Sequence, residues 1–350
     1  MTHREPIGPP WDYAWAGRVD EHTFNSEALT GNPLGDPHRR PLLVYLPPGY
    51  DADLDRRYPT IYRLQGLTGQ VDMWHNRGAF RPNPLEAIDD LFARGDTPPT
   101  IVVHVDAWTR LGGSQFVDSP GTGRYHTYLC DEIVPFIDAH YRTLARPEHR
   151  GLAGKSSGGY GAMVNAMLRP DLFGALATHA GDALFEACYL PEFAGAARAL
   201  AREHDGRFER FWADFRARAG RVRGGDDHLL NVWCMAACYS ADADGTVRLP
   251  FETDTGRLVP EVWDRWLAWD PVRMAPLHAE ALRSMRGIWI DAGRSDEFNL
   301  DLGAIAFRGE LAKLGIGEPT VHFELFDGTH SNIEWRYPMA IGWLAERLAP

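Results

Sequence analysis

The chain has 350 residues, of which 44% are hydrophobic and 24% charged, a composition typical of a folded globular protein rather than a disordered or fibrous one. Its 36 Lys and Arg residues against 48 Asp and Glu residues give a formal charge of −12, which excludes nucleic acid and anionic membrane surfaces as natural partners. With four cysteines and no apolar run long enough to span a bilayer, we expect a soluble, cytoplasmic protein without a disulfide scaffold, a cofactor or a metal.

The elements are predicted from the N-terminus onward. Residues 1–17 contain acidic residues and prolines where a signal peptide needs an uninterrupted apolar stretch, so no signal peptide is predicted. Short apolar runs then alternate with helical patterns, which predicts a mostly parallel sheet with helices on both faces. The predicted strands are Leu42–Leu46, Thr60–Leu64, Ile101–Val105, Arg150–Ala153, Leu176–His179, Gly287–Asp291 and Val321–Phe326. The predicted helices are Thr127–Tyr141, Gly159–Leu168, Leu302–Leu314 and Ser331–Leu348.

Residues 183–286 do not follow this alternation and contain five of the twelve tryptophans. An insertion at this point of a doubly wound sheet would lie over the carboxyl ends of the strands, where ligands bind. We therefore predict a core formed by residues 1–182 and 287–350, together with a helical, aromatic-rich insertion at 183–286. Two interpretations stay open for the insertion: a subdomain packed around its own apolar core, or a cap that also shapes a substrate site.

The strand at Arg150–Ala153 leads into Gly154-Lys155-Ser156-Ser157-Gly158, which matches the pattern G-x-S-x-G. A helix is predicted directly after it, so the pattern has the strand–turn–helix context of the nucleophile elbow of α/β-hydrolases. Such a turn exposes the serine hydroxyl at the top of the sheet, and a side chain at either flanking glycine would collide with backbone. We predict Ser156 as the nucleophile; Ser157 lacks two glycines at the required spacing.

A serine nucleophile needs a base that a carboxylate orients, and α/β-hydrolases supply these in the order Ser, acid, His. His330 follows the last predicted strand on a glycine-containing loop and is the predicted base. Asp296, after the strand Gly287–Asp291, is the predicted acid. Glu297, one residue further, and Asp182 remain alternatives for the acid. Asp291 is a weaker candidate because it ends the strand.

The developing oxyanion needs two preorganised N–H donors, one after the nucleophile and one from the loop after an early strand. The first prediction is therefore the amide of Ser157. The second is the amide of Leu67, because Gln65-Gly66-Leu67-Thr68-Gly69 forms a glycine-containing turn after the strand Thr60–Leu64.

Several separated motifs in this order resemble one known family. They are Val44-Tyr45-Leu46-Pro47-Pro48-Gly49-Tyr50, Gln65-Gly66, Tyr141-Arg142-Thr143, Gly154–Ala162 and Gly328-Thr329-His330. Together they resemble the esterase D or putative-esterase family of α/β-hydrolases, which includes S-formylglutathione hydrolases, feruloyl esterases, enterochelin esterases and mycolyltransferases. The resemblance implies the same fold and the same assignments: Ser156, Asp296 and His330 as the triad, Leu67 and Ser157 as oxyanion donors. Gln65, Lys155 and Ser157 depart from the family's commoner residues, and the long insertion does too.

The expected function is that of a cofactor-free serine esterase, which hydrolyses a small or medium carboxylic ester through an acyl-enzyme. Trp74, Trp108 and Asp182 are predicted near the substrate, the two tryptophans for an apolar or aromatic group. The opposing interpretation is that these aromatic residues and those of the insertion only pack the cap. Two functional alternatives share the fold: an acyltransferase with the same triad and an alcohol acceptor, and a non-catalytic binding protein.

Overall fold

The computed structural model describes residues 13–350 apart from positions 79 and 219. Most of residues 1–17, where no signal peptide is predicted, therefore lies outside the described residues. An eight-stranded sheet with the order β1-β2-β4-β3-β7-β8-β9-β10 forms its centre. The strands β1 and β2 and the strands β2 and β4 pair antiparallel, and every later pair in the sheet is parallel. The predicted α/β-hydrolase class, a mostly parallel sheet, is confirmed.

All seven predicted strands exist, and three have the predicted bounds. The strands are β1 (Arg18–Asn25), β2 (Arg39–Leu46), β3 (Thr60–Leu64), β4 (Ile101–Val105), β7 (Arg150–Lys155), β8 (Ala175–His179), β9 (Gly287–Gly293) and β10 (Val321–Phe326), with a small hairpin of β5 (Asp118–Ser119) and β6 (Gly123–Arg124). The strand β1 is not predicted from the sequence, because this edge strand is polar and has no buried residue, so no apolar run marks it.

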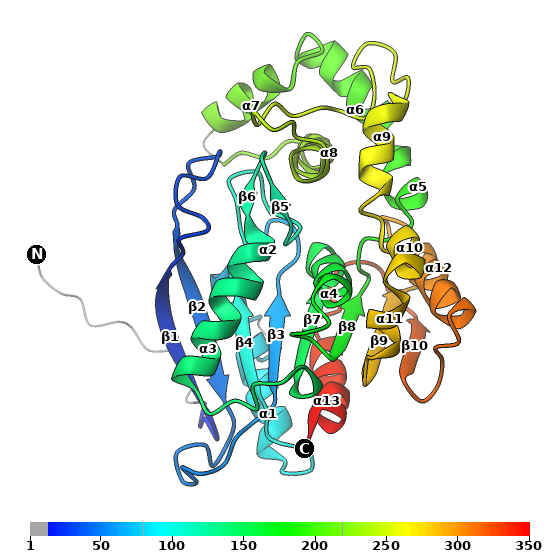
Figure 1. The fold of residues 1–350 in the computed structure, drawn as a ribbon. Coiled ribbons are helices and arrows are strands. Elements are labelled where there is room, and N and C mark those ends of the chain that lie inside the picture. The colour runs from blue at the N-terminus through cyan, green and yellow to red at the C-terminus, as the bar shows by residue number, and fades with distance from the viewer. Residues whose placement is uncertain (1–12, 79, 219) are drawn as a thin grey trace, which may run out of the picture.

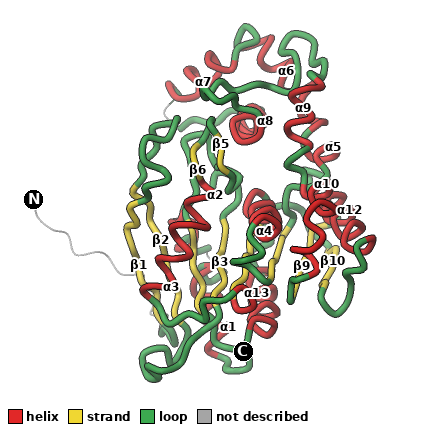
Figure 2. Tube along the Cα trace, in the orientation of Figure 1, coloured by secondary structure: helices red, strands yellow, loops and turns green. Residues whose placement is uncertain are grey.

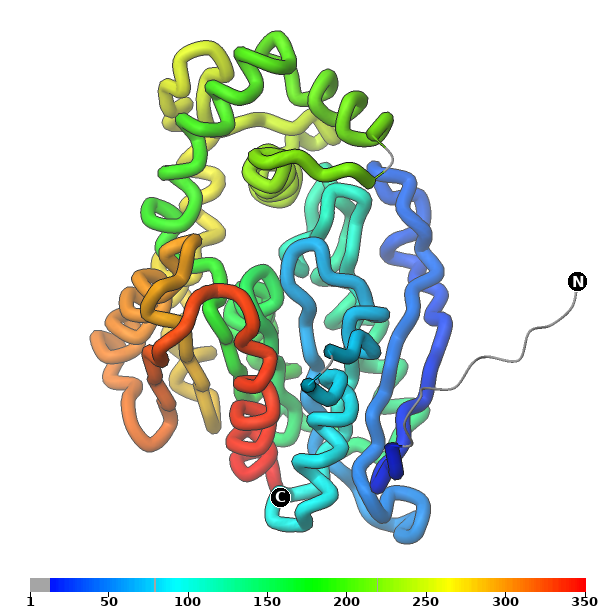
Figure 3. The backbone as a smooth tube through the Cα atoms, turned by 180° about the vertical axis from the view of Figure 1, so that it is seen from behind, coloured from blue at the N-terminus to red at the C-terminus, as the bar shows by residue number. Residues whose placement is uncertain are grey.

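Helices cover both faces of the sheet, as Figure 2 shows. Seen from behind, α1 (Pro84–Ala93) and α13 (Arg336–Leu348) lie side by side over one face (Figure 3). The other face carries α2 (Tyr125–Thr127), a π-helical stretch at Tyr128–Ile133, α3 (Val134–His140), α4 (Ser157–Leu168) and α12 (Leu300–Lys313). Short 3-10 turns lie at Val71–His75, Pro147–His149 and Ala275–His278. Two apolar cores result, one on each side of the sheet.

The region predicted as an insertion is helical in the structure. It contains α5 (Phe185–Cys188), α6 (Leu190–Glu203), α7 (Phe208–Ala217), α8 (Asp226–Tyr239), α9 (Pro260–Leu267), α10 (Pro271–Met274) and α11 (Ala279–Arg283). The helices α6 to α9 lie above the ends of the strands (Figure 1). Aromatic contacts hold them together, among them the edge-to-face contacts of Phe193 with Trp263 and Trp266. The helices α10 and α11 instead pack on α4.

Within the described part of the chain, no helix has both the length and the apolar character needed to cross a membrane. The four cysteines are free and buried.

Candidate active site

Ser156 lies in a sharp turn between β7 and α4. Its φ of 56° and ψ of −128° fall outside the ordinary regions for a residue with a side chain. A Cβ added to Gly154 would lie 2.2 Å from the Gly158 carbonyl oxygen, and one added to Gly158 would lie 2.2 Å from the Leu64 carbonyl oxygen. The two glycines are therefore required by close backbone contacts, and the turn has the geometry of a nucleophile elbow.

His330 lies on the loop after β10 and is held at two points. Its ring nitrogen Nδ1 is 2.9 Å from Oδ2 of Asp296, and its backbone N–H donates to Oε2 of Glu297 at 2.6 Å. The other oxygen of Asp296 accepts the N–H of Phe298 at 2.9 Å, which fixes the carboxylate in its own turn. The structure thus brings Asp296, rather than Glu297, to the imidazole.

The two other candidate acids have different partners. Asp291 is completely buried and bonds the Nδ1 of His179 at 2.6 Å, while its other oxygen accepts from Trp289 and Arg336. Asp182 accepts from the hydroxyl of Tyr189 at 2.7 Å. Neither carboxylate bonds the His330 ring, so the structure does not support either alternative.

A cavity of about 780 Å³ opens over these residues. The predicted site residues that line it are Leu67, Ser156, Ser157, Asp182 and His330. Its apolar lining comes from both the core and the insertion, and includes Met73, Phe215, Val222, Leu230, Phe298 and Leu300. The elbow, the histidine and the proposed oxyanion donors therefore share one space.

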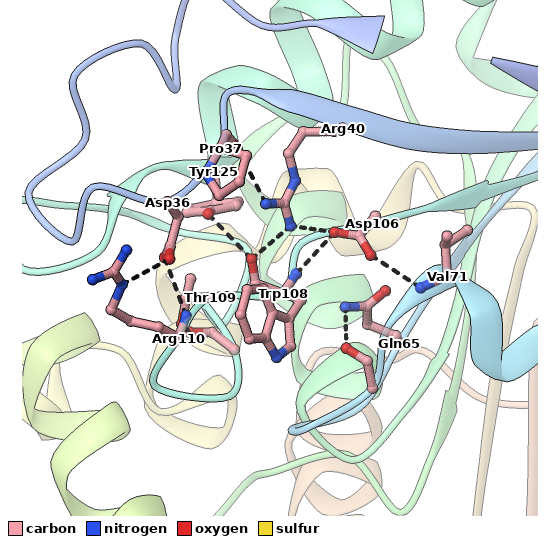
Figure 4. Close-up of polar contacts among 12 residues, drawn as sticks. Asp36, Pro37, Arg40, Gln65, Val71, Asp106, Trp108, Thr109, Arg110 and Tyr125 are labelled. Carbon is pink, nitrogen blue, oxygen red and sulfur yellow. Dashed lines mark hydrogen bonds and ion pairs between the residues drawn. The ribbon is translucent and has the colours of Figure 1, made fainter. Parts of the chain in front are cut away.

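The loop that carries Leu67 is braced from both sides. Within it, the Nε2 of Gln65 donates to the Gly69 carbonyl at 2.6 Å. At its end, the N–H of Val71 donates to Oδ2 of Asp106 at 3.0 Å, and the other oxygen of Asp106 forms a buried ion pair with Arg40 (Figure 4). Because the backbone is held on both sides, the position of the Leu67 amide is fixed before a substrate binds.

The Leu67 and Ser157 amides are also available for a ligand. Among the described residues, neither amide donates a hydrogen bond to another protein group. Both residues line the same cavity as Ser156. Unpaired amides beside a nucleophile are what stabilisation of an oxyanion requires.

The predicted places of Trp74 and Trp108 need correction. Trp74 is fully buried in the core beneath α13, where its ring contacts those of His104 and Tyr337. Trp108 is partly buried, and its carbonyl accepts from the Arg40 guanidinium in the brace of Figure 4. Neither lines the cavity. Aromatic type alone does not show which side of a loop a side chain occupies.

The aromatic residues that do line the cavity were missed. Tyr337 and Phe298 follow the two late strands, and Phe215 and Tyr189 come from the insertion. Their place depends on how the insertion folds back over the sheet, which no local pattern in the sequence indicates. Lys155 lines the same cavity, and burial lowers the pKa of its ammonium group.

Comparisons with known proteins show the family of the chain. Residues 37–341 match the model of the family described as putative esterase. The chain belongs to the putative esterase family. It is 28% identical over 179 residues to an endo-1,4-beta-xylanase/feruloyl esterase of Xylanibacter ruminicola, covering 50% of this chain and 22% of that protein. It is 30% identical over 170 residues to an esterase of Mycobacterium tuberculosis, covering 47% of this chain and 33% of that protein.

Several solved structures share the fold. A ferulic acid esterase aligns with a TM-score of 0.59 and 20% identity over 95% of this chain and 100% of that chain. An S-formylglutathione hydrolase from Agrobacterium tumefaciens aligns with a TM-score of 0.56 and 19% identity over 97% of this chain and 98% of that chain. The chain spans less than two thirds of the length of the curated relatives that it matches.

Proposed function

We propose that this member of the putative esterase family is a serine carboxylic-ester hydrolase that works through an acyl-enzyme. The observation that carries the proposal is the shared cavity: the strained Ser156 turn opens into the same space as His330, whose Nδ1 lies 2.9 Å from Asp296. A nucleophile, a base and an orienting acid, each from a different strand end, are the parts that acyl transfer needs.

In this mechanism the Ser156 hydroxyl attacks the ester carbonyl, and His330 takes its proton. The Leu67 and Ser157 amides stabilise the negative oxygen of the tetrahedral intermediate. The alcohol leaves with the proton from His330, and water, activated by the same imidazole, then releases the acid. Asp296 holds the ring in the tautomer that accepts the proton and stabilises the imidazolium that forms.

The lining of the cavity favours an ester with an apolar or aromatic part. Side chains of Met73, Phe215, Val222 and Phe298 supply the apolar surface, and the volume of about 780 Å³ accommodates a small or medium molecule. One relative is named as a feruloyl esterase. The feruloyl group is an aromatic acyl group, which supports the same substrate class. We propose that the helices α6 to α9 act as a cap that closes this cavity and selects the substrate.

The proposal is tested with a fluorophosphonate probe and with p-nitrophenyl acetate. We expect the probe to label the wild-type protein once, on Ser156 rather than Ser157, as mass spectrometry of the peptide that contains both serines would show. The Ser156→Ala variant should lose labelling and turnover. The matched control is Ser331→Ala, which changes an exposed serine beside His330 outside the cavity lining.

Turnover by Ser156→Ala at the wild-type rate would refute the nucleophile assignment. A folded wild-type protein that neither reacts with the probe nor cleaves any ester would instead support a non-catalytic role. Analysis of the products with and without added alcohol separates hydrolysis from transfer of the acyl group.

A further inference from the structure

Asp182 differs from every other buried aspartate in the described part of the chain. Seven others have both carboxylate oxygens hydrogen-bonded to protein groups; they are Asp36, Asp89, Asp106, Asp226, Asp270, Asp291 and Asp296. Asp182 has one such oxygen. Its Oδ2 accepts from the Tyr189 hydroxyl at 2.7 Å and from Gln115 Nε2 at 3.0 Å. Its Oδ1 accepts from no described residue.

The residue that carries this free oxygen lines the cavity. Asp182 follows β8, lines the cavity together with Ser156 and His330, and is only 5% exposed. No described Lys, Arg or His side chain forms an ion pair with it. Because Asp182 lines an open cavity and its Oδ1 is an unused acceptor, this oxygen is available to a donor group of a bound ligand. Burial also raises the pKa of this carboxyl group.

The neighbourhood favours a neutral donor over a cation. The charge of His330 lowers the pKa of the Asp182 carboxyl group against the larger effect of burial, so the two groups lie within electrostatic range of each other. His330 becomes an imidazolium during each acyl transfer, and a substrate ammonium bound at Asp182 would be repelled by it. A hydroxyl group donates the same hydrogen bond without this repulsion.

We propose that Oδ1 of Asp182 accepts a hydrogen bond from a hydroxyl group of the substrate and so selects hydroxylated esters. This inference rests on the proposed function, because it names a substrate class for the same cavity. Asp182 is then a polar specificity residue in a cavity that also presents the apolar side chains of Met73 and Phe298. The other oxygen of Asp182, Oδ2, holds the insertion in place through Tyr189. The same side chain then both binds the substrate and positions the cap.

The test uses matched esters that carry a hydroxyl or a methoxy group at the same carbon. The panel moves this group along the acyl chain and along the alcohol, with the unsubstituted ester as reference, and pH-stat titration gives kcat/KM for each. A methoxy group keeps the oxygen but cannot donate. In at least one pair the wild-type enzyme should prefer the hydroxyl ester by about tenfold or more, the discrimination expected for a hydrogen bond to a charged acceptor.

The decisive variant is Asp182→Asn. Both partners of Oδ2 are donors, so the asparagine oxygen should take that position and its NH₂ group should face the cavity. The variant keeps the bonds to Tyr189 and Gln115 but presents a donor to the substrate, and the preference for hydroxyl over methoxy should vanish or reverse. The control Gln115→Ala removes one of these bonds, keeps the carboxylate, and should keep the preference.

The outcomes separate this inference from the proposed function. An active wild-type enzyme without a hydroxyl preference in any pair would overturn the inference and leave the esterase proposal standing, and this arm needs no variant. An unchanged hydroxyl-to-methoxy ratio in folded Asp182→Asn would overturn it as well. A wild-type protein that cleaves no ester of the panel and resists the fluorophosphonate probe would contradict the proposed function itself.

Discussion

Glu297 accepts the backbone N–H of His330 at 2.6 Å, while its neighbour Asp296 lies 2.9 Å from the ring of the same histidine. Two consecutive carboxylates therefore hold His330: Asp296 bonds the ring of the histidine, and Glu297 bonds its backbone N–H. The division of labour follows from the turn at 296–300, in which the Phe298 N–H fixes the Asp296 carboxylate.

The first prediction separates these two roles. Asp296→Asn should lower kcat by about 10³- to 10⁴-fold, because the amide favours the wrong imidazole tautomer. Glu297→Gln keeps an oxygen acceptor for the backbone N–H and should lower kcat by less than about tenfold. Steady-state hydrolysis of p-nitrophenyl acetate measures both. Equal losses in the two variants would contradict the assignment of Asp296 as the acid.

The second prediction concerns the backbone contacts of the elbow. Gly158→Ala would place a Cβ 2.2 Å from the Leu64 carbonyl oxygen, so we expect a loss of activity together with a lower melting temperature. Gly309, within α12, has open space at the same position and is the matched control. Gly309→Ala should raise stability by about 0.5–1 kcal/mol, the helix preference of alanine. Unchanged activity in Gly158→Ala would rule out the close contact.

The third prediction concerns the brace of the Leu67 loop. Asp106→Asn removes the charge that pairs with the buried Arg40 and should destabilise the protein by about 3–5 kcal/mol. Because Asp106 also fixes the Val71 N–H, kcat should fall in the fraction that stays folded. The exposed pair of Arg18 and Asp51 gives the control, in which Asp51→Asn should cost at most about 1 kcal/mol. Similar urea unfolding curves for the two variants would contradict this account.

The fourth prediction is a dependence of stability on pH. Burial, reinforced by the charge of Arg63, lowers the pKa of His104 well below the ordinary value. Below about pH 6.5 the unfolded chain binds a proton at this histidine and the folded chain does not, so its contribution to stability falls as the pH falls. The slope from one such group is at most about 1.4 kcal/mol per pH unit.

The variant His104→Leu removes this group and should reduce the acid sensitivity. Urea unfolding of both proteins at pH 7.5 and 5.5 checks the sign, since the free energy of the wild type should drop more between the two. Parallel losses would show that His104 does not resist protonation in the folded state.

The sequence predicts the parallel part of the sheet because its strands are short, mostly apolar runs, as in β3 and β4, which are buried throughout. It also predicts which strand ends carry Ser156, Asp296 and His330, because turn residues and chain order mark them. Their catalytic roles stay proposals until the variants are measured. The edge strand β1 escapes prediction because it is polar and no apolar run marks it. The cavity wall escapes prediction because residues such as Phe215 reach it only when the insertion folds over the core, which no local pattern indicates.

The segment between β8 and β9 leaves the sheet after Asp182 and returns through α10 and α11, which pack on α4. None of Ser156, Asp296 and His330 lies within it. A relative could thus lengthen, shorten or exchange this segment by recombination. Its specificity for esters would change, while the three residues proposed for catalysis would stay in place. Grafting α6 to α9 from one relative onto another is a practical route to redirecting such an enzyme.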